Sequence, residues 1–505
     1  MLMNNYFEKF EKSVLWFILL LAFAVKVPAI GNPLVGYFGS YQSLYGMMAA
    51  MMTKTGVHAF LIPQFFILDH GLPAIRLLDY PFAAACAAIA VKILGGSIDF
   101  WGRAQAALFT LGSAYILFKL AKKYFGVQIA LIATAVYSFS PMALVSGISF
   151  RNESIAVFFF LLSILVFVRF AHWWTFVSGL LFGVAVVGRV HFLLVLPTFL
   201  TILWIQRKKK MFFATFLLGS AIPAIFWFGH AYQIHSHYPN VWTSIFMQSQ
   251  EGRILFHPLL LSSLFYERLF EIVTGFYMTP LMFAFLIFGF ARWNKQTIPF
   301  VVWALSSLSV IFWLPQKVYD DSFYLISSLP AASILTGFAC YHLIEFSKFR
   351  KGVVLLSAVF AFCVLRYYIP PAFLSIIPDR HIPQIGQEIQ RLTQPNDAVI
   401  AQHGSAPDLL YYSNRMGWTF DLGMRGYAQA RHQFLLKDKE RESEGYGDPV
   451  EWLEVLRKRG AHFLAISDLQ SFYADQIFSN DVVRKYKQVP TNSPGLALFD
   501  LRSKP

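Results

Sequence analysis

Residues 14–30 read VLWFILLLAFAVKVPAI, and this apolar run decides the class of fold. A helix that crosses a bilayer needs about 20 mostly apolar residues, and the run is close to that length. A long polar loop, residues 31–100, follows it, and further apolar runs then continue to about residue 370. The chain therefore divides into a transmembrane part, residues 1–370, and a tail, residues 371–505, that is typical of a soluble α/β domain.

The composition is that of a polytopic, α-helical membrane protein. The chain has 505 residues, of which 56% are hydrophobic and 14% are charged, whereas soluble domains average about 25% charged residues. The net charge of +14 would raise nucleic acid as a partner of a soluble protein. Here many basic residues lie between apolar runs, where they set topology and meet anionic headgroups, and no nucleic-acid motif accompanies them. We therefore expect membrane lipid as a partner and no nucleic acid.

The apolar runs predict about eleven spanning helices. They lie near residues 14–30, 102–121, 125–144, 154–170, 174–190, 192–206, 211–230, 270–291, 297–315, 322–344 and 352–370. Four basic clusters lie between them: Lys119/Lys122/Lys123, Arg207–Lys210, Arg292/Lys295 and Lys348/Arg350/Lys351. With a cytoplasmic N-terminus, eleven spans place every cluster in the cytoplasm, as the positive-inside rule requires. We therefore expect a multi-pass protein of the cytoplasmic (inner) membrane whose first loop and C-terminal domain are extracytoplasmic.

Two helices are predicted within the first outer loop. Ser43–Met52 is rich in Met and Ala, and Phe82–Leu94 is an apolar, Ala-rich stretch that is too short to span a bilayer comfortably. Both are typical of helices that lie in the membrane interface. An extra pair of spans is the alternative, although the connecting residues 53–80 leave it little room.

The tail alternates helix and strand signals, which predicts a small α/β domain with its own core. Asp448 followed by Pro449 is a helix start signal, because Asp caps free amides and Pro fits the first turn. The predicted elements are a helix at Ile385–Leu392, a strand at Asp397–Gln402, a helix at Val450–Arg459, a strand at His462–Ile466, and a hairpin of Lys485–Val489 with Leu496–Leu501.

Two acids of the first loop are candidate catalytic residues. Asp69 and Asp79 lie in the segments FILDHG and RLLDYP. Asp79 directly precedes the Tyr80-Pro81 start of the Ala-rich helix, so an N-cap is the simpler role. The alternative is a general base, because such a carboxylate faces the water–lipid boundary where a lipid-linked substrate arrives.

Ionisable residues also gather where the predicted spans end on the outer side. Glu153 follows Arg151 at the start of the fourth predicted span, where an acid in the first turn is favourable to the helix dipole. An ion pair between Glu153 and Arg151 is the simpler account of both residues. Arg151 could equally bind a phosphate, since a guanidinium makes two parallel bonds to phosphoryl oxygens. Further residues at the ends of apolar runs are Arg103, Arg189, His191 and the group Lys317, Asp320, Asp321 and Tyr324. Cations at one membrane face predict a site for an anionic lipid head such as a polyprenyl phosphate, with snorkelling to headgroups as the alternative.

No motif for a metal or a nucleotide cofactor is present. The sequence contains no P-loop, no Gly-rich dinucleotide motif after a strand, no zinc-ligand spacing and no Gly-x-Ser-x-Gly. His235 and His237 lie two residues apart, with nothing near them in the sequence to complete a metal site. We expect no metal and no cofactor.

Three local patterns resemble the membrane glycosyltransferases of the GT-C fold class, specifically bacterial relatives of the dolichyl-phosphate-mannose protein mannosyltransferases and aminoarabinose transferases. The first, similar to the family's first outer loop, is Tyr41-Gln42 before a Met-rich helix, then Asp69-His70-Gly71, Asp79-Tyr80-Pro81-Phe82 and Leu94-Gly95-Gly96. The second and third, similar to the starts of the fourth and a late span, are Phe150-Arg151-Asn152-Glu153 and Tyr319-Asp320-Asp321-Ser322-Phe323-Tyr324. The tail resembles the family's extracytoplasmic domain in Tyr411-Tyr412-Ser413-Asn414-Arg415 and Leu498-Phe499-Asp500-Leu501.

The resemblance implies inverting transfer of a sugar from a polyprenyl-phosphate carrier to a lipid, glycan or protein acceptor at the outer face of the membrane. In such enzymes a loop carboxylate is the general base, because an alcohol is a poor nucleophile until a base takes its proton. Basic residues hold the donor phosphate, whose developing charge needs stabilisation as it leaves. The residues predicted on this basis are Asp79 as base, Glu153 and Asp69 as further acids, and Gln42, Arg103, Arg151, Arg189, His191, Lys317 and Tyr324 as substrate or phosphate binders.

The sequence departs from the family at one position. The family has an acid just before the Gln of the first loop, regarded as the catalytic base, whereas this chain has Phe38-Gly39-Ser40-Tyr41-Gln42. Either Asp79, Asp69 or Glu153 replaces that acid, or transferase activity has been lost and the protein only binds lipid-linked glycan. A transporter or flippase for polyprenyl-linked glycans is a further alternative; it would need internal repeats, and no convincing repeat relates the two halves.

Overall fold

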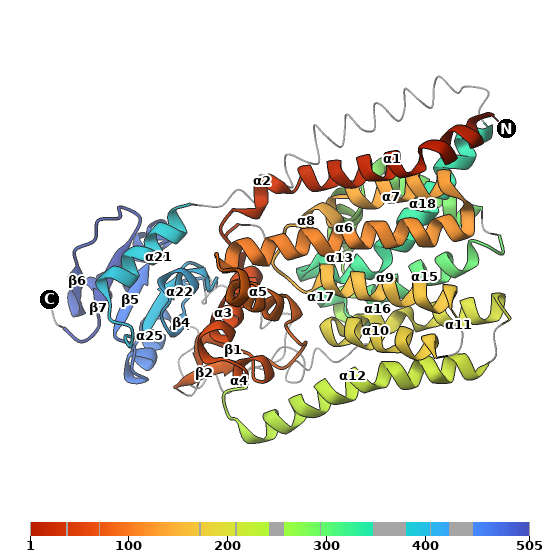
Figure 1. Cartoon of the computed structure of the whole chain (residues 1–505). Helices are drawn as coiled ribbons and strands as arrows, with labels where there is room; N and C mark the ends of the chain where they lie inside the picture. The colour runs from red at the N-terminus through yellow and green to blue at the C-terminus, as the bar shows by residue number, and fades with distance from the viewer. Residues whose placement is uncertain are drawn as a thin grey trace. The chain divides into compact units, whose positions relative to one another are not determined.

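The structure is a computed structural model that describes residues 2–36, 39–69, 71–170, 173–207, 210–241, 257–292, 294–346, 380–404, 406–423 and 448–503. The chain forms two compact units (Figure 1). The helical unit comprises Met1–Gly31, Trp101–Ala231 and Arg253–Ser375, and the sheet unit comprises Asn32–Phe100, Tyr232–Gly252 and Ile376–Pro505. The first outer loop therefore shares a compact unit with the tail. The division at residue 370 into a transmembrane and a soluble domain stays a prediction.

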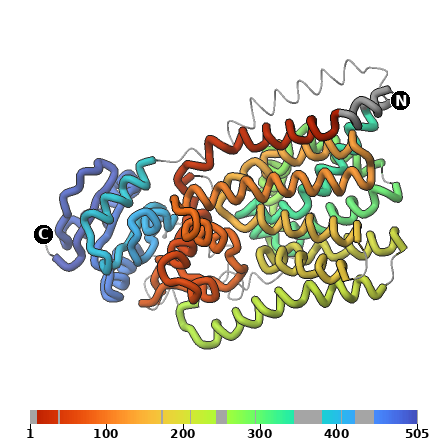
Figure 2. The backbone as a smooth tube through the Cα atoms, in the orientation of Figure 1, coloured from red at the N-terminus to blue at the C-terminus, as the bar shows by residue number. Residues whose placement is uncertain are grey.

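Long helices that run along a common direction make up the helical unit (Figures 1 and 2). Its first half contains α1 (Leu2–Ala24), α2 (Val27–Ile30), α6 (Ile98–Phe125), α7 (Val127–Phe139), α8 (Pro141–Ser146), α9 (Glu153–Arg169), α10 (Trp174–Gly188), η1 (Val190–Val195), α11 (Leu196–Ile205) and α12 (Lys210–His237). Its second half contains η3 (Pro258–Leu261), α13 (Ser263–Glu271), η4 (Ile272–Tyr277), α14 (Pro280–Ala291), α15 (Ile298–Leu308), α16 (Val310–Trp313), α17 (Pro315–Asp320), η5 (Ser322–Ser328) and α18 (Leu329–Phe346).

Capping residues start several of these helices. Ser140 accepts a hydrogen bond from the Ala143 amide at 3.4 Å and stands before the proline that opens α8. Thr279 accepts one from the Met282 amide at 3.3 Å before the proline that opens α14. A hydroxyl at the N-cap satisfies a free amide, and proline fits the first turn because its missing N–H is not needed there.

Glycines let the helices of this unit approach closely. A Cβ atom on Gly179 of α10 would collide with the carbonyl oxygen of Phe216 in α12, and one on Gly183 would lie 2.5 Å from that of Ser220. In the same way, a Cβ atom on Gly337 of α18 would lie 2.8 Å from the Ala133 amide nitrogen of α7. Close contact through small residues is the usual packing of helices within membranes.

The number of spanning helices is smaller by a strict criterion than the eleven predicted. Among the described residues, four helices are long and apolar enough to cross a membrane, or five if the bent pair Ser263–Tyr277 and Pro280–Ala291 is one span. The four are Phe10–Ile30, Ile98–Phe125, Lys210–His237 and Ser322–Leu343. Shorter apolar helices account for several other predicted spans, because turns divide the apolar runs: Val127–Phe139, Trp174–Gly188, Val190–Ile205 and Ile298–Trp313. The predicted span 352–370 and the cluster Lys348/Arg350/Lys351 lie outside the described residues.

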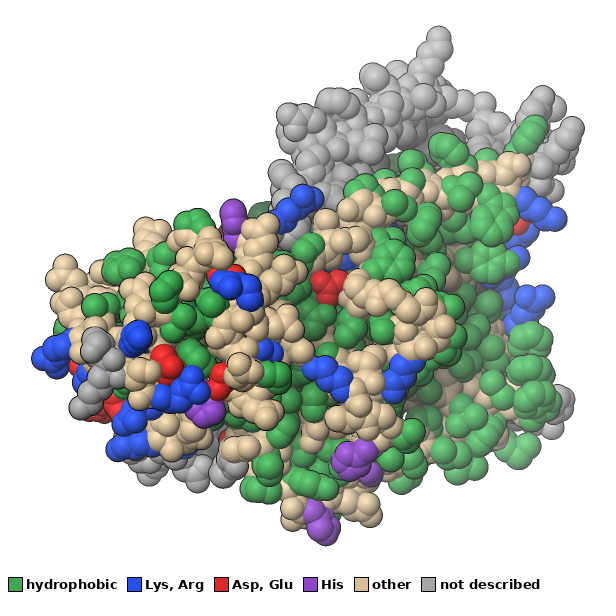
Figure 3. Space-filling model, turned by 60° about the vertical axis from the view of Figure 1, so that its left-hand side comes forward, with side chains coloured by type: hydrophobic (Ala, Val, Ile, Leu, Met, Phe, Trp, Pro, Cys, Tyr) green, Lys and Arg blue, Asp and Glu red, His purple; other side chains and the backbone are tan. Residues whose placement is uncertain are grey.

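The surface of the helical unit is rich in apolar side chains. Trp16, Phe17, Trp204, Ile225 and Phe226 are each more than half exposed. Hydrophobic side chains cover much of this unit on the face drawn in Figure 3, whereas charged side chains are scattered among them on the sheet unit. Large exposed apolar surfaces are rare on soluble proteins and are expected of helices in lipid.

A seven-stranded sheet, in the order β2-β1-β4-β3-β5-β7-β6, organises the sheet unit. Its strands are β1 (Gln64–Asp69), β2 (Leu72–Ile75), β3 (Val399–Gln402), β4 (Gly417–Thr419), β5 (Phe463–Ile466), β6 (Lys487–Val489) and β7 (Ala497–Asp500). Its helices are α3 (Gly39–Thr55), α4 (His58–Leu61), α5 (Phe82–Leu94), α21 (His381–Leu392), α22 (Asp408–Ser413), α25 (Pro449–Lys458), α26 (Leu469–Ala474) and α27 (Gln476–Lys485). The central strands β3, β4 and β5 are parallel, and antiparallel pairs flank them.

The first outer loop is bound to the tail within this unit. Strand β1 of the loop pairs in parallel with β4 of the tail through Ile67 and Gly417. The hydroxyls of Tyr411 and Tyr412 donate hydrogen bonds to the Asp99 carboxylate at 2.6 and 2.9 Å. Burial, together with the nearby Asp99 carboxylate, holds the pKa of Tyr411 well above its usual value, so this phenol stays a donor.

Most predicted elements of the tail are confirmed. Helix α21, strands β3 and β5 and the antiparallel pair β6–β7 lie where the sequence predicted them. Asp448 caps α25, since its carboxylate accepts a hydrogen bond from the Val450 amide at 2.8 Å. In the loop, α5 has the predicted bounds, and α3 extends the predicted helix Ser43–Met52 at both ends. Neither loop helix meets the length criterion for a span.

Candidate functional site

Four charged side chains form a buried ion network in the helical unit. Arg151 Nη2 lies 2.5 Å from Asp321 Oδ2 and 2.7 Å from Glu153 Oε1. Arg189 Nη2 donates to the same Glu153 Oε1. The side chains are 1%, 5%, 3% and 9% exposed for Arg151, Asp321, Glu153 and Arg189. Two cations and two anions balance, which is what keeps such a buried set compatible with folding.

The network joins segments that are far apart in the sequence. Arg151 and Glu153 stand at the junction of α8 and α9, where Asn152 precedes the helix and donates to the Gly188 carbonyl at 3.3 Å. Arg189 directly follows α10, and Asp321 separates α17 from η5. The other oxygen of Asp321 accepts a hydrogen bond from the Phe323 amide at 3.1 Å, which fixes its carboxylate. Helix ends thus aim all four side chains at one point.

Glu153 Oε2 is one of several buried atoms of the network without a hydrogen-bond partner among the described residues. The other oxygen, Oε1, contacts two guanidinium groups. A buried carboxylate oxygen without a donor is unfavourable unless another molecule supplies one. The arrangement can therefore accept a proton or a hydroxyl group at Oε2, and it can present two arginines to an anion.

Two further cations contact the segment that leads to this junction. Arg103 is fully buried and donates to the Ile148 carbonyl at 2.6 Å, so it supports the segment that leads to Arg151. Lys26 of the first predicted span is also fully buried and donates to the Ala22 carbonyl at 2.9 Å. A Cβ atom on Gly147 would collide with Cε of Lys26, so Lys26 packs directly against this segment.

The other predicted binders in this unit take different positions. His191 is buried, and the centroid of its ring lies 5.1 Å from that of the Tyr324 ring. In the sequence, His191 is close to Arg189 and Tyr324 is close to Asp321. Lys317 lies in α17 and is half-buried. The structure thus brings together Arg151, Glu153 and Arg189, and their role in a substrate site stays a prediction.

Asp79 lies in the sheet unit and has its own partners. Its Oδ2 accepts a hydrogen bond from the Tyr45 hydroxyl at 3.0 Å, and its Oδ1 lies 3.1 Å from Arg76 Nη2. The N-cap of α5 is Pro81, without a side-chain cap. The Asp79 carboxylate is turned to Tyr45 and Arg76, and its role as a helix cap stays an alternative. Its role as a base stays a prediction.

The remaining predicted residues of the loop are also in the sheet unit. Asp69 ends β1 and lies opposite Leu72 of β2, at the tip of the hairpin. Gln42 lies fully buried in α3. In the part of the chain that the structure describes, no group of three or more His, Cys, Asp or Glu side chains could hold a metal ion. The expectation that no metal is needed stays a prediction.

Sequence reasoning missed Asp321 and Lys26 as site residues. Asp321 belongs to the quoted segment Tyr319–Tyr324, and its signal was an acid directly before an apolar run. Lys26 is a cation inside an apolar run, which is costly in a membrane and for that reason a candidate by default. The pairing of Asp321 with Arg151 could not be assigned from the sequence, since the two residues lie 170 positions apart.

The chain is similar to known proteins both in sequence and in fold. Residues 78–228 match the family described as dolichyl-phosphate-mannose-protein mannosyltransferase. The chain is similar over 96% of its length to 97% of ArnT from Cupriavidus metallidurans in the apo state, with a TM-score of 0.60 and 14% sequence identity. The chain has the GT-C fold. The resemblance drawn from the sequence is thereby confirmed.

Other solved GT-C structures agree. ArnT bound to undecaprenyl phosphate gives a TM-score of 0.60 at 13% identity, over 96% of this chain and 97% of that chain. The archaeal oligosaccharyltransferase AglB from Archaeoglobus fulgidus, in complex with an inhibitory peptide and a dolichol-phosphate, gives 0.53 at 12% identity, over 95% and 73%. No curated protein sequence matches the chain. At 12–14% sequence identity, similarity to these solved structures shows the fold of the chain alone.

Proposed function

We propose that this chain is a glycosyltransferase, of the hexosyltransferase type, that moves a sugar from a polyprenyl-phosphate donor to a hydroxyl group of a lipid, glycan or protein acceptor. The observation that carries the proposal is the buried ion network of Arg151, Glu153, Arg189 and Asp321 in a GT-C fold. Ionisable groups between apolar helices are energetically costly, and for that reason they usually mark a functional site. Solved GT-C structures that hold undecaprenyl phosphate and dolichol-phosphate support a lipid phosphate as the donor.

The proposed reaction is a single displacement with inversion. The acceptor oxygen attacks the anomeric carbon, and the bond from that carbon to the donor phosphate breaks, with its electron pair leaving on the phosphate. The hydroxyl proton passes to a carboxylate, which raises the nucleophilicity of the acceptor oxygen as the bond forms. Cationic side chains stabilise the charge that grows on the departing phosphate.

Glu153 is the base that the contacts favour. Its Oε2 is buried and has no partner among the described residues, so a lone pair is available for a proton. Asp79 remains the second choice, because each of its oxygens already accepts a hydrogen bond, from Tyr45 and from Arg76. Asp69, at the tip of a hairpin, is the third choice.

The arginines of the network hold the donor phosphate in this mechanism. Arg189 is the most exposed of the four side chains and contacts the Glu153 carboxylate. A phosphate that takes this guanidinium competes with Glu153, and the released carboxylate then accepts the acceptor's proton. Arg151, paired with both acids, positions them. The other predicted substrate-binding residues are secondary to these in the proposal: Gln42, Arg103, His191, Lys317 and Tyr324.

The proposed setting is the cytoplasmic membrane, with a cytoplasmic N-terminus and with the tail and the first loop on the outer side. The basic clusters between apolar runs support this topology through the positive-inside rule. No metal and no cofactor besides the lipid-linked donor enters the mechanism.

An inactive binding protein is the second candidate. The segment Ser40-Tyr41-Gln42 lacks the acid that the resembling family places before its glutamine, which favours this candidate. It retains recognition of lipid-linked glycan and loses transfer.

The test uses the purified full chain in lipid nanodiscs with a panel of radiolabelled polyprenyl-phosphate sugars and a membrane extract as acceptor. Release of polyprenyl phosphate is measured for the wild type, Arg189→Gln and Arg169→Gln. Arg169 is a matched control, since it lies exposed at the other end of α9. We expect turnover that Arg189→Gln lowers by about 100-fold or more, as loss of a charge-stabilising group does. Donor binding without turnover would support the inactive candidate, and equal effects of the two variants would remove Arg189 from the site.

A further inference from the structure

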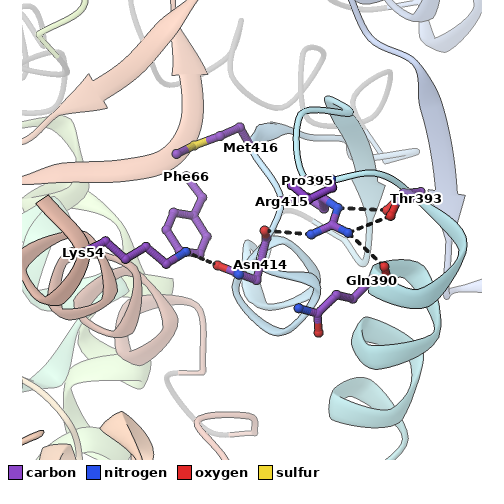
Figure 4. Close-up of a pocket in the computed structure, with 8 residues that line it drawn as sticks. All are labelled: Lys54, Phe66, Gln390, Thr393, Pro395, Asn414, Arg415 and Met416. Carbon is purple, nitrogen blue, oxygen red and sulfur yellow. Dashed lines mark hydrogen bonds between the residues drawn. The ribbon is translucent and has the colours of Figure 1, made fainter.

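A pocket of the sheet unit is lined by none of the residues assigned to the reaction. Its volume is about 450 Å³, within the roughly 300–1,000 Å³ range of small-molecule sites. Figure 4 shows the side chains that surround it. The lining residues come from α3 and β1 of the first loop and from α21, β4 and their flanks in the tail: Lys54, Phe66, Gln390, Thr393, Pro395, Asn414, Arg415 and Met416.

The lining carries positive charge alone. Lys54 and Arg415 are its charged residues, and the other lining residues are neutral, so no carboxylate faces these cations within the pocket. Burial, and the nearby Arg415 guanidinium, lower the pKa of Lys54 below its usual value. The two cations therefore repel each other, and an anion between them would relieve that repulsion.

Lys54 is held by neutral groups. Its Nζ donates to Asn414 Oδ1 at 2.5 Å and lies 5.1 Å from the centroid of the Phe66 ring. An ammonium group has three donors, so this arrangement leaves donors for a ligand. Asn414 adopts the left-handed backbone conformation, φ 52°, that ends α22, and this places its side chain beside Lys54.

Arg415 likewise has neutral partners. Its Nε donates to Thr393 Oγ1 at 2.9 Å, and Nη2 donates to the carbonyls of Gln390 and Thr393 at 2.8 and 2.7 Å. Its Nη1 donates to the carbonyls of Ser413 and Asn414 at 3.4 and 3.3 Å, so Arg415 acts on a ligand through its charge. The side chain is only 4% exposed, and no ion pair of Arg415 is found among the described residues. Burial lowers the pKa of Arg415, and the nearby Asp397 carboxylate opposes that shift. Bonds to the last carbonyls of α21 explain its position, because cations are favourable at a helix C-terminus. They do not explain why Lys54 is brought to the same place.

We propose that this pocket binds the acidic group, a carboxylate or a phosphate, of an anionic saccharide. Lys54 and Arg415 neutralise the acid, Asn414 and Thr393 offer hydrogen bonds to sugar hydroxyls, and Pro395 and Met416 form an apolar wall. The volume fits a monosaccharide unit with one acidic substituent. The proposal rests on the proposed transferase function in naming the saccharide as part of the acceptor, and it assigns the sheet unit to acceptor recognition.

The experiment measures equilibrium binding by the full chain in nanodiscs, without any donor. The probes are glucuronate, glucose 6-phosphate, glucose and inorganic phosphate, each with wild type, Lys54→Gln and Lys92→Gln. Lys92 is a matched control, because it is exposed in the same unit and lies 5.7 Å from the centroid of the Phe60 ring but does not line the pocket. Thermal unfolding verifies that each variant is folded.

We expect an acidic sugar to bind at least tenfold more tightly than glucose. Lys54→Gln should weaken that binding by about tenfold, as loss of one charge-assisted hydrogen bond does, and Lys92→Gln should leave it unchanged. A preference between glucuronate and glucose 6-phosphate identifies the acid. Equal binding of glucose and the acidic sugars, or equal effects of the two lysine variants, would overturn the proposal. Inorganic phosphate that binds as tightly as glucose 6-phosphate would overturn the saccharide as ligand. Because no turnover is measured, these results are independent of whether the chain transfers a sugar.

Discussion

The two units of this protein each hold a cluster of ion pairs, and the clusters differ in depth and in reach. In the helical unit, the side chains of Arg151, Glu153, Arg189 and Asp321 are at most 9% exposed and come from segments separated by up to 170 positions. In the sheet unit, Glu454, Arg457, Asp481 and Lys485 lie on α25 and α27, and their side chains are 16–41% exposed.

The difference indicates which of the two charged clusters has a role other than keeping the protein surface soluble. Exposed pairs contribute little to stability and follow from the charged surfaces of two neighbouring helices. A buried network is no better for stability than apolar residues of the same volume, yet removal of one member leaves an uncompensated charge. The network of the helical unit is therefore the cluster to which we assign chemistry, and substitutions should separate the two clusters.

The largest effect is expected for Asp321→Asn. The change removes the carboxylate 2.5 Å from Arg151 and leaves the buried network with one excess positive charge. The free energy of unfolding should fall by about 3–5 kcal/mol, as for other broken buried pairs. Thermal unfolding in detergent measures it. Asp320→Asn is the matched control, because this neighbouring acid is exposed and should change stability by less than about 0.5 kcal/mol. Similar shifts for both variants would contradict the contrast between the clusters.

A paired substitution should recover most of that loss. Arg151→Met together with Asp321→Leu removes one charge of each sign and leaves the contact between Arg189 and Glu153. Replacement of a buried pair by apolar residues is often neutral or stabilising, so the double variant should be more stable than Asp321→Asn alone. A double-mutant cycle on thermal unfolding gives the coupling. Additive losses would show that the two residues act independently.

An intermediate effect is expected at Asp79. Its side chain is 6% exposed and pairs with Arg76, a neighbour in the sequence, so it stands between the two clusters. Tyr45→Phe removes the hydroxyl that donates to Asp79 Oδ2, which should lower the free energy of unfolding by about 1–2 kcal/mol. Tyr473→Phe, at an exposed tyrosine of the same unit, should have no measurable effect. A harmless Tyr45→Phe would place Asp79 with the exposed pairs.

The smallest effect is expected for the exposed cluster, and it should depend on pH. Burial raises the pKa of Glu454, but hydrogen bonds from Tyr486 and Arg457 outweigh it and hold the pKa below the usual value. The ionised form therefore stabilises the fold at pH values above the unfolded pKa of about 4.3, and this contribution is lost as pH falls through the lower folded value. The melting temperatures of wild type and Glu454→Gln should differ slightly at pH 7 and converge at acid pH.

The control for this effect is Tyr486→Phe. It removes one of the two donors to Glu454, so it should lose part of the pH-dependent stability. Added to Glu454→Gln, it should remove no further pH-dependent stability. A difference between wild type and Glu454→Gln that grows as pH falls would contradict the direction of the shift.

Local patterns in the sequence were enough for the elements. The apolar runs predicted most helices, and α5 has the predicted bounds because the proline before it and the glycine after it end the apolar pattern. Asp448 and Pro449 predicted the start of α25 for the same reason. Helix-start and helix-end signals depend on neighbours in the chain, so a single sequence contains them.

Long-range pairing could not be predicted. Strand β1 of the loop joins β4 of the tail, and a Cβ atom on Gly417 would collide with the Val399 carbonyl of β3, so only glycine fits there. Nothing in either segment specifies that partner. The same holds for the site: Arg151, Glu153 and Arg189 were predicted, while Asp321 was not recognised as their partner because it arrives from a different helix end.

The most direct test of the central claim is the single-turnover rate of sugar transfer, with Glu153→Gln compared with Asp79→Asn in nanodiscs at saturating donor. If the network performs the chemistry, Glu153→Gln should lower the rate by about 10²–10⁴-fold, as loss of a general base does, while Asp79→Asn should lower it by less than about tenfold. A Glu153→Gln protein that is folded and transfers sugar at the wild-type rate would contradict the account. Loss of transfer confined to Asp79→Asn would move the reaction to the first outer loop.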